Sequence, residues 1–255
     1  MTQYFDTHAH YDSGKFNADR DEVLRAVHES GVALIVDPGD CAVTSARAVA
    51  IAQEYDFVYA AVGWHPEEAA GWTDDSLDRI RALAAQPKVC AIGEIGLDYY
   101  WDNEPREVQK KWFIRQLELA RELDLPVLIH SREAAADTME IMKEHAKGLS
   151  GVIHCYSYSK EIAQEYIKMG FYIGVGGVVT FKNAKKLKEV VENIPLTSIV
   201  LETDCPYMAP EPNRGKRNNS AYIRYVAEKI AELKGITYEE VVEQTEKNAR
   251  DMYRL

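Results

Sequence analysis

The feature that most limits the fold of this chain is a regular alternation of short apolar runs with amphipathic helical stretches. Eight runs have the composition of buried β-strands, and each is followed by a stretch of helical character, at intervals of roughly 20 to 40 residues. Several are almost continuously apolar, as strands covered on both faces are. The predicted strands are Tyr4–His8, Ala33–Asp37, Phe57–Gly63, Val89–Gly93, Val127–His130, Val152–His154, Phe171–Val175 and Ser198–Glu202.

Eight strand–helix units in 255 residues match the size of a (β/α)8 barrel of the α/β class. No linker, repeat block or low-complexity segment divides the sequence, so we expect one domain over residues 1–255. A doubly wound open sheet is the alternative, and the strand count favours the barrel. Two helices are marked most clearly: Glu107–Leu123 by a continuous apolar face, and the last helix by a capping box that opens at Thr237.

Polar residues that can bind metal ions stand at the ends of several predicted strands. His8 and His10 are two positions apart, so on a strand they face the same side and can approach one ion. An isolated pair of this kind is as often an ordinary strand feature, and a single histidine at a strand end is more often a hydrogen-bonded rim residue. A barrel, however, brings all its strand ends to one mouth. The ligand types gathered there are His8, His10, Glu94, His130, His154 and Asp204, enough for two ions that share a bridge.

The net charge of −11, from 30 basic and 41 acidic residues, argues against broad wrapping of duplex nucleic acid. It leaves open a nucleic acid held locally by metal ions and a few cations. The start of the sequence lacks a charged-then-apolar leader, and no apolar run is long enough to span a bilayer. We therefore expect a cytoplasmic protein without membrane contact, a monomer by default, whose four scattered cysteines are reduced.

Taken together, these motifs resemble the TatD family of metal-dependent deoxyribonucleases, among the amidohydrolase-like barrel hydrolases. The resemblance covers the whole chain in the right order. It rests on Asp6-Thr-His-Ala-His10, Gly63-Trp-His-Pro66, Ile92-Gly-Glu-Ile-Gly-Leu-Asp98, Ile129-His-Ser-Arg132, Ile153-His154, Leu201-Glu-Thr-Asp204-Cys-Pro206 and the stretch from Ala209 to Asn218.

The resemblance implies two divalent metal ions, drawn from Zn, Mn, Mg, Co or Ni, bridged by Glu94. The first ion would be held by His8, His10, Glu94 and Asp204, and the second by Glu94, His130 and His154. Glu94 and Asp204 are the predicted catalytic residues, with Asp204 as the general base for the attacking water. His65 is expected to contact a phosphate or to serve as an outer ligand. The implied activity is hydrolysis of DNA phosphodiester bonds, as a 3′→5′ exonuclease on single strands.

Two further features concern the substrate. The cations Arg214, Lys216 and Arg217 follow the eighth predicted strand and form a candidate phosphate clamp, although such loops are often only solvated surface. The aromatic residues Trp64, Tyr99, Tyr100 and Trp101 could stack on unpaired bases or simply roof the barrel.

Two other functions remain open at this point. One is a metal-dependent hydrolase of a small ester, an amide or an aminoacyl-RNA linkage, built on the same barrel. The other is a metal-dependent binding module without catalysis, which the abundance of candidate ligands disfavours.

Overall fold

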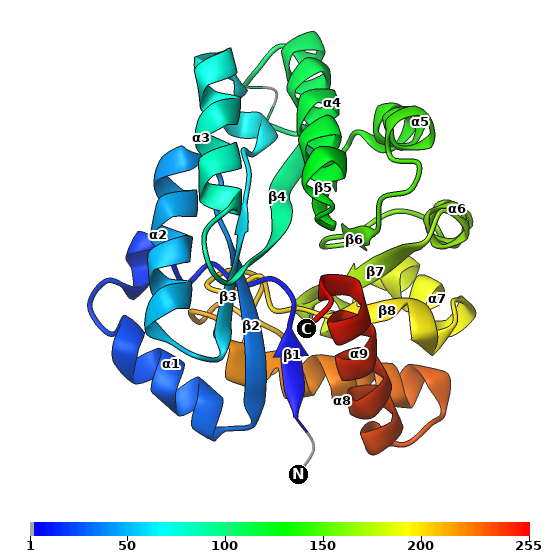
Figure 1. The fold of residues 1–255 in the computed structure, drawn as a ribbon. Coiled ribbons are helices and arrows are strands. Elements are labelled where there is room, and N and C mark those ends of the chain that lie inside the picture. The colour runs from blue at the N-terminus through cyan, green and yellow to red at the C-terminus, as the bar shows by residue number, and fades with distance from the viewer. Residues whose placement is uncertain (1–2, 102) are drawn as a thin grey trace.

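The computed structural model describes residues 3–101 and 103–255, and its eight strands form one parallel sheet curled into a barrel (Figure 1). Neighbouring strands pair in chain order from the first to the eighth. The (β/α)8 prediction is therefore confirmed. The strands are β1 (Tyr4–Asp6), β2 (Val32–Pro38), β3 (Val58–Val62), β4 (Val89–Asp98), β5 (Val127–Arg132), β6 (Gly151–Ile153), β7 (Phe171–Val175) and β8 (Ile199–Leu201).

The barrel closes where the chain leaving β1 meets β8. The backbone N–H and the hydroxyl of Thr7 both donate to the carbonyl of Leu201, each at 3.0 Å. Beyond them, Ala9 and Cys205 form a parallel bridge, and the N–H of Asp204 donates to the carbonyl of His8 at 2.9 Å. This closure sets the segment after β1 beside the segment after β8, although about 200 residues separate them in the sequence.

Helices surround the barrel, and α9 lies beside β1 (Figure 1). The predicted helix 107–123 is α4, and the predicted capping box at Thr237 is present: its hydroxyl accepts from the N–H of Glu240 at 3.2 Å, and the Glu240 carboxylate accepts from the N–H of Thr237 at 2.8 Å. The helices are α1 (Arg20–Glu29), α2 (Ala42–Glu54), α3 (Asp74–Ala84), α4 (Arg106–Leu123), α5 (Ala135–His145), α6 (Lys160–Lys168), α7 (Lys185–Asn193), α8 (Ile223–Lys234) and α9 (Tyr238–Tyr253). In the described ranges, no helix is both long enough and apolar enough to cross a membrane.

The apolar core has two parts. The smaller cluster includes buried side chains of seven strands, such as Phe5 and Leu128, together with three residues of α9. Tyr253 of α9 stacks on Phe5 with ring centroids 5.6 Å apart, and its hydroxyl donates to the carbonyl of Thr7 at 2.9 Å. The larger cluster packs strands against the surrounding helices. Packed on both sides, the strands hold the residues at their ends in fixed positions.

Only β7 has the predicted bounds, and three of the seven differences bear on the residues at the strand ends. β1 ends at Asp6 because the Asp6 carboxylate accepts the N–H and hydroxyl of Thr203, at 2.9 and 2.5 Å, which draws the following residues toward β8. β8 covers only Ile199–Leu201. β4 continues past the predicted end at Gly93 as far as Asp98, because residues 95–98 resume pairing with β5 after an irregularity. Glu94 therefore lies within a strand and not after it.

Candidate metal centre

A cavity of about 800 Å³ opens at the carboxyl ends of the strands. Its wall contains five of the six predicted ligands, and the sixth, His8, is fully buried beside them. The wall also contains His65. The five ligands are His10, Glu94, His130, His154 and Asp204.

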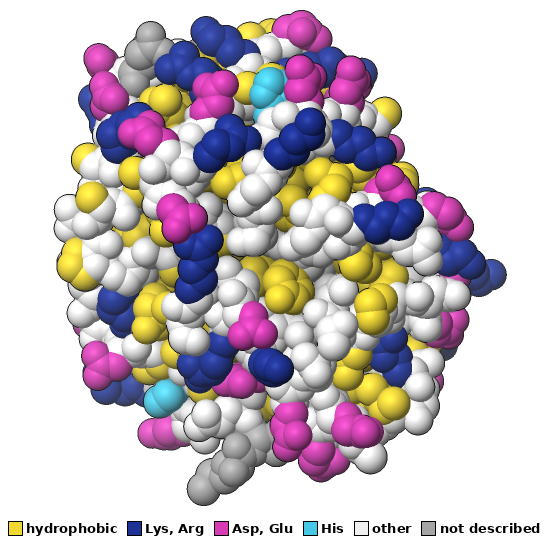
Figure 2. Space-filling view, turned by 45° about the vertical axis from the view of Figure 1, so that its right-hand side comes forward, with side chains coloured by type: hydrophobic (Ala, Val, Ile, Leu, Met, Phe, Trp, Pro, Cys, Tyr) yellow, Lys and Arg dark blue, Asp and Glu magenta, His cyan; other side chains and the backbone are white. Residues whose placement is uncertain are grey.

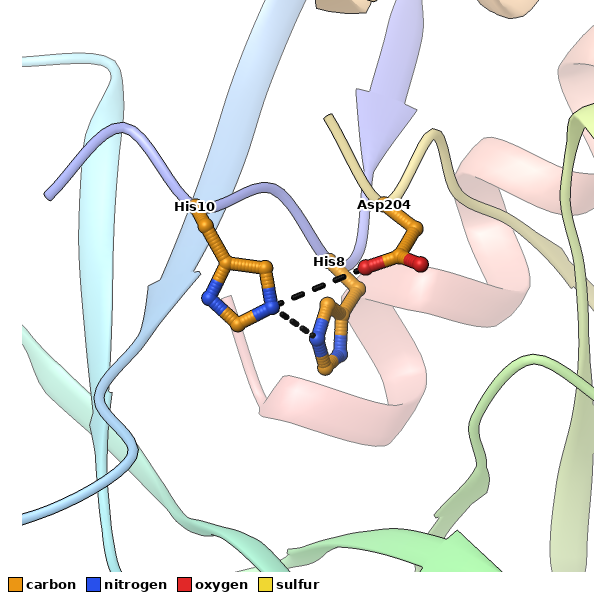
Figure 3. A group of neighbouring side chains, drawn as sticks. All are labelled: His8, His10 and Asp204. Atoms are coloured by element: carbon orange, nitrogen blue, oxygen red, sulfur yellow. Dashed lines mark hydrogen bonds and ion pairs between the residues drawn. The ribbon is translucent and has the colours of Figure 1, made fainter. Parts of the chain in front are cut away.

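The first group consists of His8, His10 and Asp204. Figure 3 shows both histidines on the segment that follows β1, with Asp204 on the neighbouring segment after β8. Nε2 of His10 lies 3.1 Å from Nε2 of His8 and 3.6 Å from Oδ1 of Asp204. Two atoms bound to one divalent ion at about 2.1 Å are about 3.0 to 3.4 Å apart. The spacing of these side chains is close to what one ion requires.

Glu94 lies between this group and the remaining histidines. Its Oε2 is 3.2 Å from Nε2 of His8 and 3.7 Å from Nε2 of His10. Its Oε1 is 2.9 Å from Nδ1 of His130 and 3.9 Å from Nε2 of His154. The two oxygens of one carboxylate thus face two sets of imidazoles, which is the arrangement of a bridging ligand.

Charge in the site favours the ionised form of Glu94. Burial opposes ionisation of Glu94, but His8 and His154 outweigh it and hold the pKa of Glu94 well below its usual value. Burial opposes a charge on His10, yet the carboxylates of Asp40, Glu94 and others raise the pKa of His10 to about 10. Burial first, and then His154, lower the pKa of His8 well below its usual value, which favours the neutral ring that a metal ligand requires. The carboxylates around His10 thus stabilise positive charge in the site.

The comparisons with known proteins agree with this geometry. The sequence profile described as TatD related DNase matches residues 5–254. The chain belongs to the TatD-related DNase family. It is 48% identical over 252 residues to the uncharacterized metal-dependent hydrolase YabD of Bacillus subtilis, covering 98% of this chain and 99% of YabD. The TatD protein of Erwinia tasmaniensis, named a 3′-5′ ssDNA/RNA exonuclease, is 32% identical over 258 residues and covers 98% of this chain and 100% of its own.

Structural similarity is equally extensive. The crystal structure of the TatD homologue YjjV of Escherichia coli superposes with a TM-score of 0.94 at 33% identity, covering 100% of this chain and 99% of YjjV. The protein is therefore a TatD-type enzyme, a metal-dependent hydrolase with the barrel of its family.

The sequence analysis assigned no role to three carboxylates of this TatD-type site. Oε2 of Glu202 lies 3.0 Å from Nδ1 of His154, and Oδ2 of Asp98 lies 2.9 Å from Nε2 of His130. A carboxylate on the second ring nitrogen commonly orients an imidazole that binds metal through the first. Glu202 stands two residues before Asp204, and Asp98 stands four residues after Glu94, both within the family motifs. Their proximity to two predicted ligands is the sequence signal that could have identified them.

The third carboxylate is Asp40, which follows β2 and forms a possible ligand group with His10 and Glu94. Burial raises the pKa of Asp40 to about 7, against the influence of His10. The position of Asp40 in the Asp37-Pro-Gly-Asp40 stretch, at the end of the second predicted strand, is the sequence signal that could have identified it as a site residue.

The predicted phosphate clamp lies outside the cavity wall, as far as the described residues show. Arg217 donates to both carboxylate oxygens of Asp19, at 2.9 and 2.5 Å, and to the carbonyl of Lys15. Arg214 lies over the ring of Phe181. Two other arginines, Arg47 and Arg132, belong to the wall.

The predicted aromatic residues separate into two kinds. Trp64 packs against Trp72 and donates to the carbonyl of Glu68, and the hydroxyl of Tyr99 donates to the Asp137 carboxylate at 2.7 Å. Those contacts are ordinary packing. Tyr100 and Trp101, in contrast, are each 54% exposed.

Proposed function

We propose that this TatD-family hydrolase cleaves phosphodiester bonds of single-stranded DNA and removes nucleotides from the 3′ end. The observation that carries the proposal is the position of Glu94, which turns one carboxylate oxygen toward His8 and the other toward His130. A phosphodiester is a poor electrophile because it is anionic, and paired cations are the usual means of neutralising it. The name of the Erwinia relative supports the same substrate and direction.

The residues fit two divalent ions. The spacing of His8, His10 and Asp204 around Glu94 suits a first ion. We assign the second ion to the opposite oxygen of Glu94 with His130 and His154, whose ring nitrogens lie 2.9 and 3.9 Å from that oxygen. Two ions bound there would lower the pKa of water and neutralise the substrate. The mixture of imidazole and carboxylate ligands suits Zn, Mn, Co or Ni and tolerates Mg.

Asp204 is the proposed general base. Its carboxylate belongs to the cavity wall, with Oδ1 at 3.6 Å from His10 and 3.9 Å from His154. Burial raises the pKa of Asp204, which makes its carboxylate a better proton acceptor than a solvated aspartate. A water between Asp204 and the bound phosphodiester would therefore lose its proton to this carboxylate.

His65 is proposed to bind phosphate. Its Nδ1 accepts the N–H of Glu67 at 3.3 Å, and burial, aided by His130, lowers the pKa of His65 to about 3. The ring is then neutral and carries its proton on Nε2, which lies 3.8 Å from Oε1 of Glu94. That N–H points into the site and can donate to a phosphate oxygen.

The surface supports a locally held substrate. Figure 2 shows basic and acidic side chains interspersed across one face of the molecule. With a net charge of −11, attraction to the strand is expected to come from the metal centre and the few cations around the mouth.

The decisive experiment is degradation of end-labelled single-stranded DNA by metal-stripped protein after Mg, Mn, Zn or Co is added back. We expect metal-dependent shortening from the 3′ end, and its loss in Glu94→Ala. Cleavage that persists unchanged in Glu94→Ala would reject the proposal. If no metal supports cleavage, turnover in a panel of small esters and amides would identify the alternative hydrolase.

A further inference from the structure

Large exposed apolar side chains gather at the mouth of the barrel. Among the described residues, six large apolar side chains are at least 36% exposed, and four of them follow β4 or β8, the strands that carry or precede Glu94 and Asp204. Exposed aromatic groups beside a catalytic cavity commonly mark a surface that binds a ligand. The six are Val43, Tyr100, Trp101, Tyr207, Met208 and Leu255.

The first of two aromatic ledges consists of Tyr100, Trp101 and Arg132. Oδ1 of Asp98 accepts the N–H groups of Tyr100 and Trp101 at 2.9 and 3.1 Å, which fixes the turn that presents both rings. The guanidinium of Arg132 lies 3.9 Å from the centroid of the Tyr100 ring and 5.6 Å from that of Trp101. Because Asp98 also contacts His130, this ledge is attached directly to the candidate metal centre.

The second ledge consists of Tyr207, Met208 and Lys15. The N–H of Tyr207 donates to the carbonyl of Asp204 at 2.9 Å, so this ledge too is attached to the centre. The ammonium group of Lys15 lies 4.0 Å above the Tyr207 ring. Tyr207 and Met208 are 46% and 42% exposed, and both belong to the cavity wall.

The order of the strands places the ledges opposite each other. The first ledge lies at the carboxyl ends of β4 and β5, and the second lies on the segments that follow β8 and β1. In a closed barrel of eight strands these two positions are half a turn apart. The cavity that contains Glu94 therefore lies between the ledges.

We propose that the two ledges bind unpaired nucleobases on the two sides of the scissile phosphodiester, so that a single strand crosses the mouth from one ledge to the other. This inference rests on the proposed function and deepens it. Each ledge combines an aromatic face, which can stack on a base of any identity, with a cation that can contact the adjoining phosphate. In a duplex the base faces are covered by stacking, so the ledges select unpaired DNA.

The first test compares Trp101→Ala and Tyr207→Ala with Leu255→Ala, a control that removes an exposed apolar side chain outside the ledges. With single-stranded DNA we expect each ledge variant to raise KM about tenfold and to change kcat little, and the control to behave as the parent. For a strand of the same length made of abasic nucleotides, which offers no aromatic ring to stack on, the increase in KM should be about tenfold smaller than for DNA. Equal increases with both substrates would overturn the proposal.

The second test uses strands with one abasic nucleotide on either side of the cleavage position. The increase in KM caused by Trp101→Ala should vanish when the base on one side is missing. The increase caused by Tyr207→Ala should vanish when the base on the other side is missing. Penalties that are the same on intact and abasic strands would overturn the proposal.

A binding measurement separates this inference from the proposed function. Protein loaded with Zn is titrated with a phosphorothioate oligothymidylate, which resists hydrolysis, and tryptophan fluorescence is recorded. Quenching in the parent that is lost in Trp101→Ala supports the ledge even if the protein cleaves no DNA. Absence of quenching, or equal quenching in Trp101→Ala, overturns it.

Discussion

Glu202 and His154 are joined by a hydrogen bond of 3.0 Å between Oε2 and Nδ1. The other carboxylate oxygen of Glu202 accepts the N–H of Cys155 at 2.7 Å, so the carboxylate cannot rotate away from the ring. Held in this way, His154 directs Nε2 toward Glu94 and Asp204, each at 3.9 Å. Glu202 is fully buried, and its contacts determine the direction in which His154 can bind an ion.

Replacing Glu202 by glutamine should weaken metal binding. The amide group keeps the size of the carboxylate but turns an N–H₂ group toward one of two donors, His154 or Cys155. We expect metal affinity to fall about 10- to 100-fold, measured by competition with a chromophoric chelator. Glu161→Gln, which changes an exposed glutamate of α6, is the matched control. Equal affinities in the parent and Glu202→Gln would show that His154 needs no support from Glu202.

Removal of metal should lower thermal stability. A ligand present at 100 times its Kd stabilises the folded state by about 2.7 kcal/mol. For a chain of this size that corresponds to a decrease of about 5 to 10 °C in Tm after chelation, measured by calorimetry or circular dichroism. Addition of excess Mn or Zn should restore the original Tm. Glu94→Ala, which lacks the proposed bridge, should respond less to chelation, and an equal response would place the stabilising ion elsewhere.

Asp204→Asn should abolish turnover and preserve the fold. Asparagine retains one oxygen for the approach of His10 but cannot accept a proton from water at neutral pH. We expect kcat on DNA to decrease at least 100-fold, with the circular dichroism spectrum unchanged. Metal content measured in the same samples distinguishes loss of the base from loss of the ion. Comparable kcat values in mutant and parent would remove Asp204 from the role of general base.

Arg217 remains a proposed phosphate contact, although its guanidinium is paired with Asp19. Arg217→Ala should raise KM for DNA and leave kcat unchanged. The effect on stability should be small, roughly 0.2 to 1 kcal/mol, because the pair is partly exposed. Asp19→Asn frees the guanidinium and should lower KM. If neither variant changes KM, Arg217 serves only to attach its loop to the segment before α1.

The sequence predicted the barrel because its signals are local. A buried parallel strand needs a continuous apolar run, and the helix after it needs one apolar face, so each unit can be identified without knowing its neighbours. The capping box at Thr237 is similarly local, since both of its hydrogen bonds join residues three positions apart. The gathering of the six candidate ligands also followed from the sequence, because parallel strands in a barrel bring all their carboxyl ends to one mouth.

Other features were decided by tertiary structure alone. One carboxylate oxygen of Glu94 faces His8 and the other faces His130. This orientation depends on the path of β4 beyond Gly93, which is determined by pairing with β5. Arg217 pairs with Asp19, 198 residues away in the sequence, and only the closure of β8 against β1 brings the two side chains together. Sequence patterns report which side chains favour a strand, a helix or a metal ion. The direction in which a carboxylate or guanidinium points is determined by packing between distant segments, because each rotamer is selected by contacts that no local pattern records.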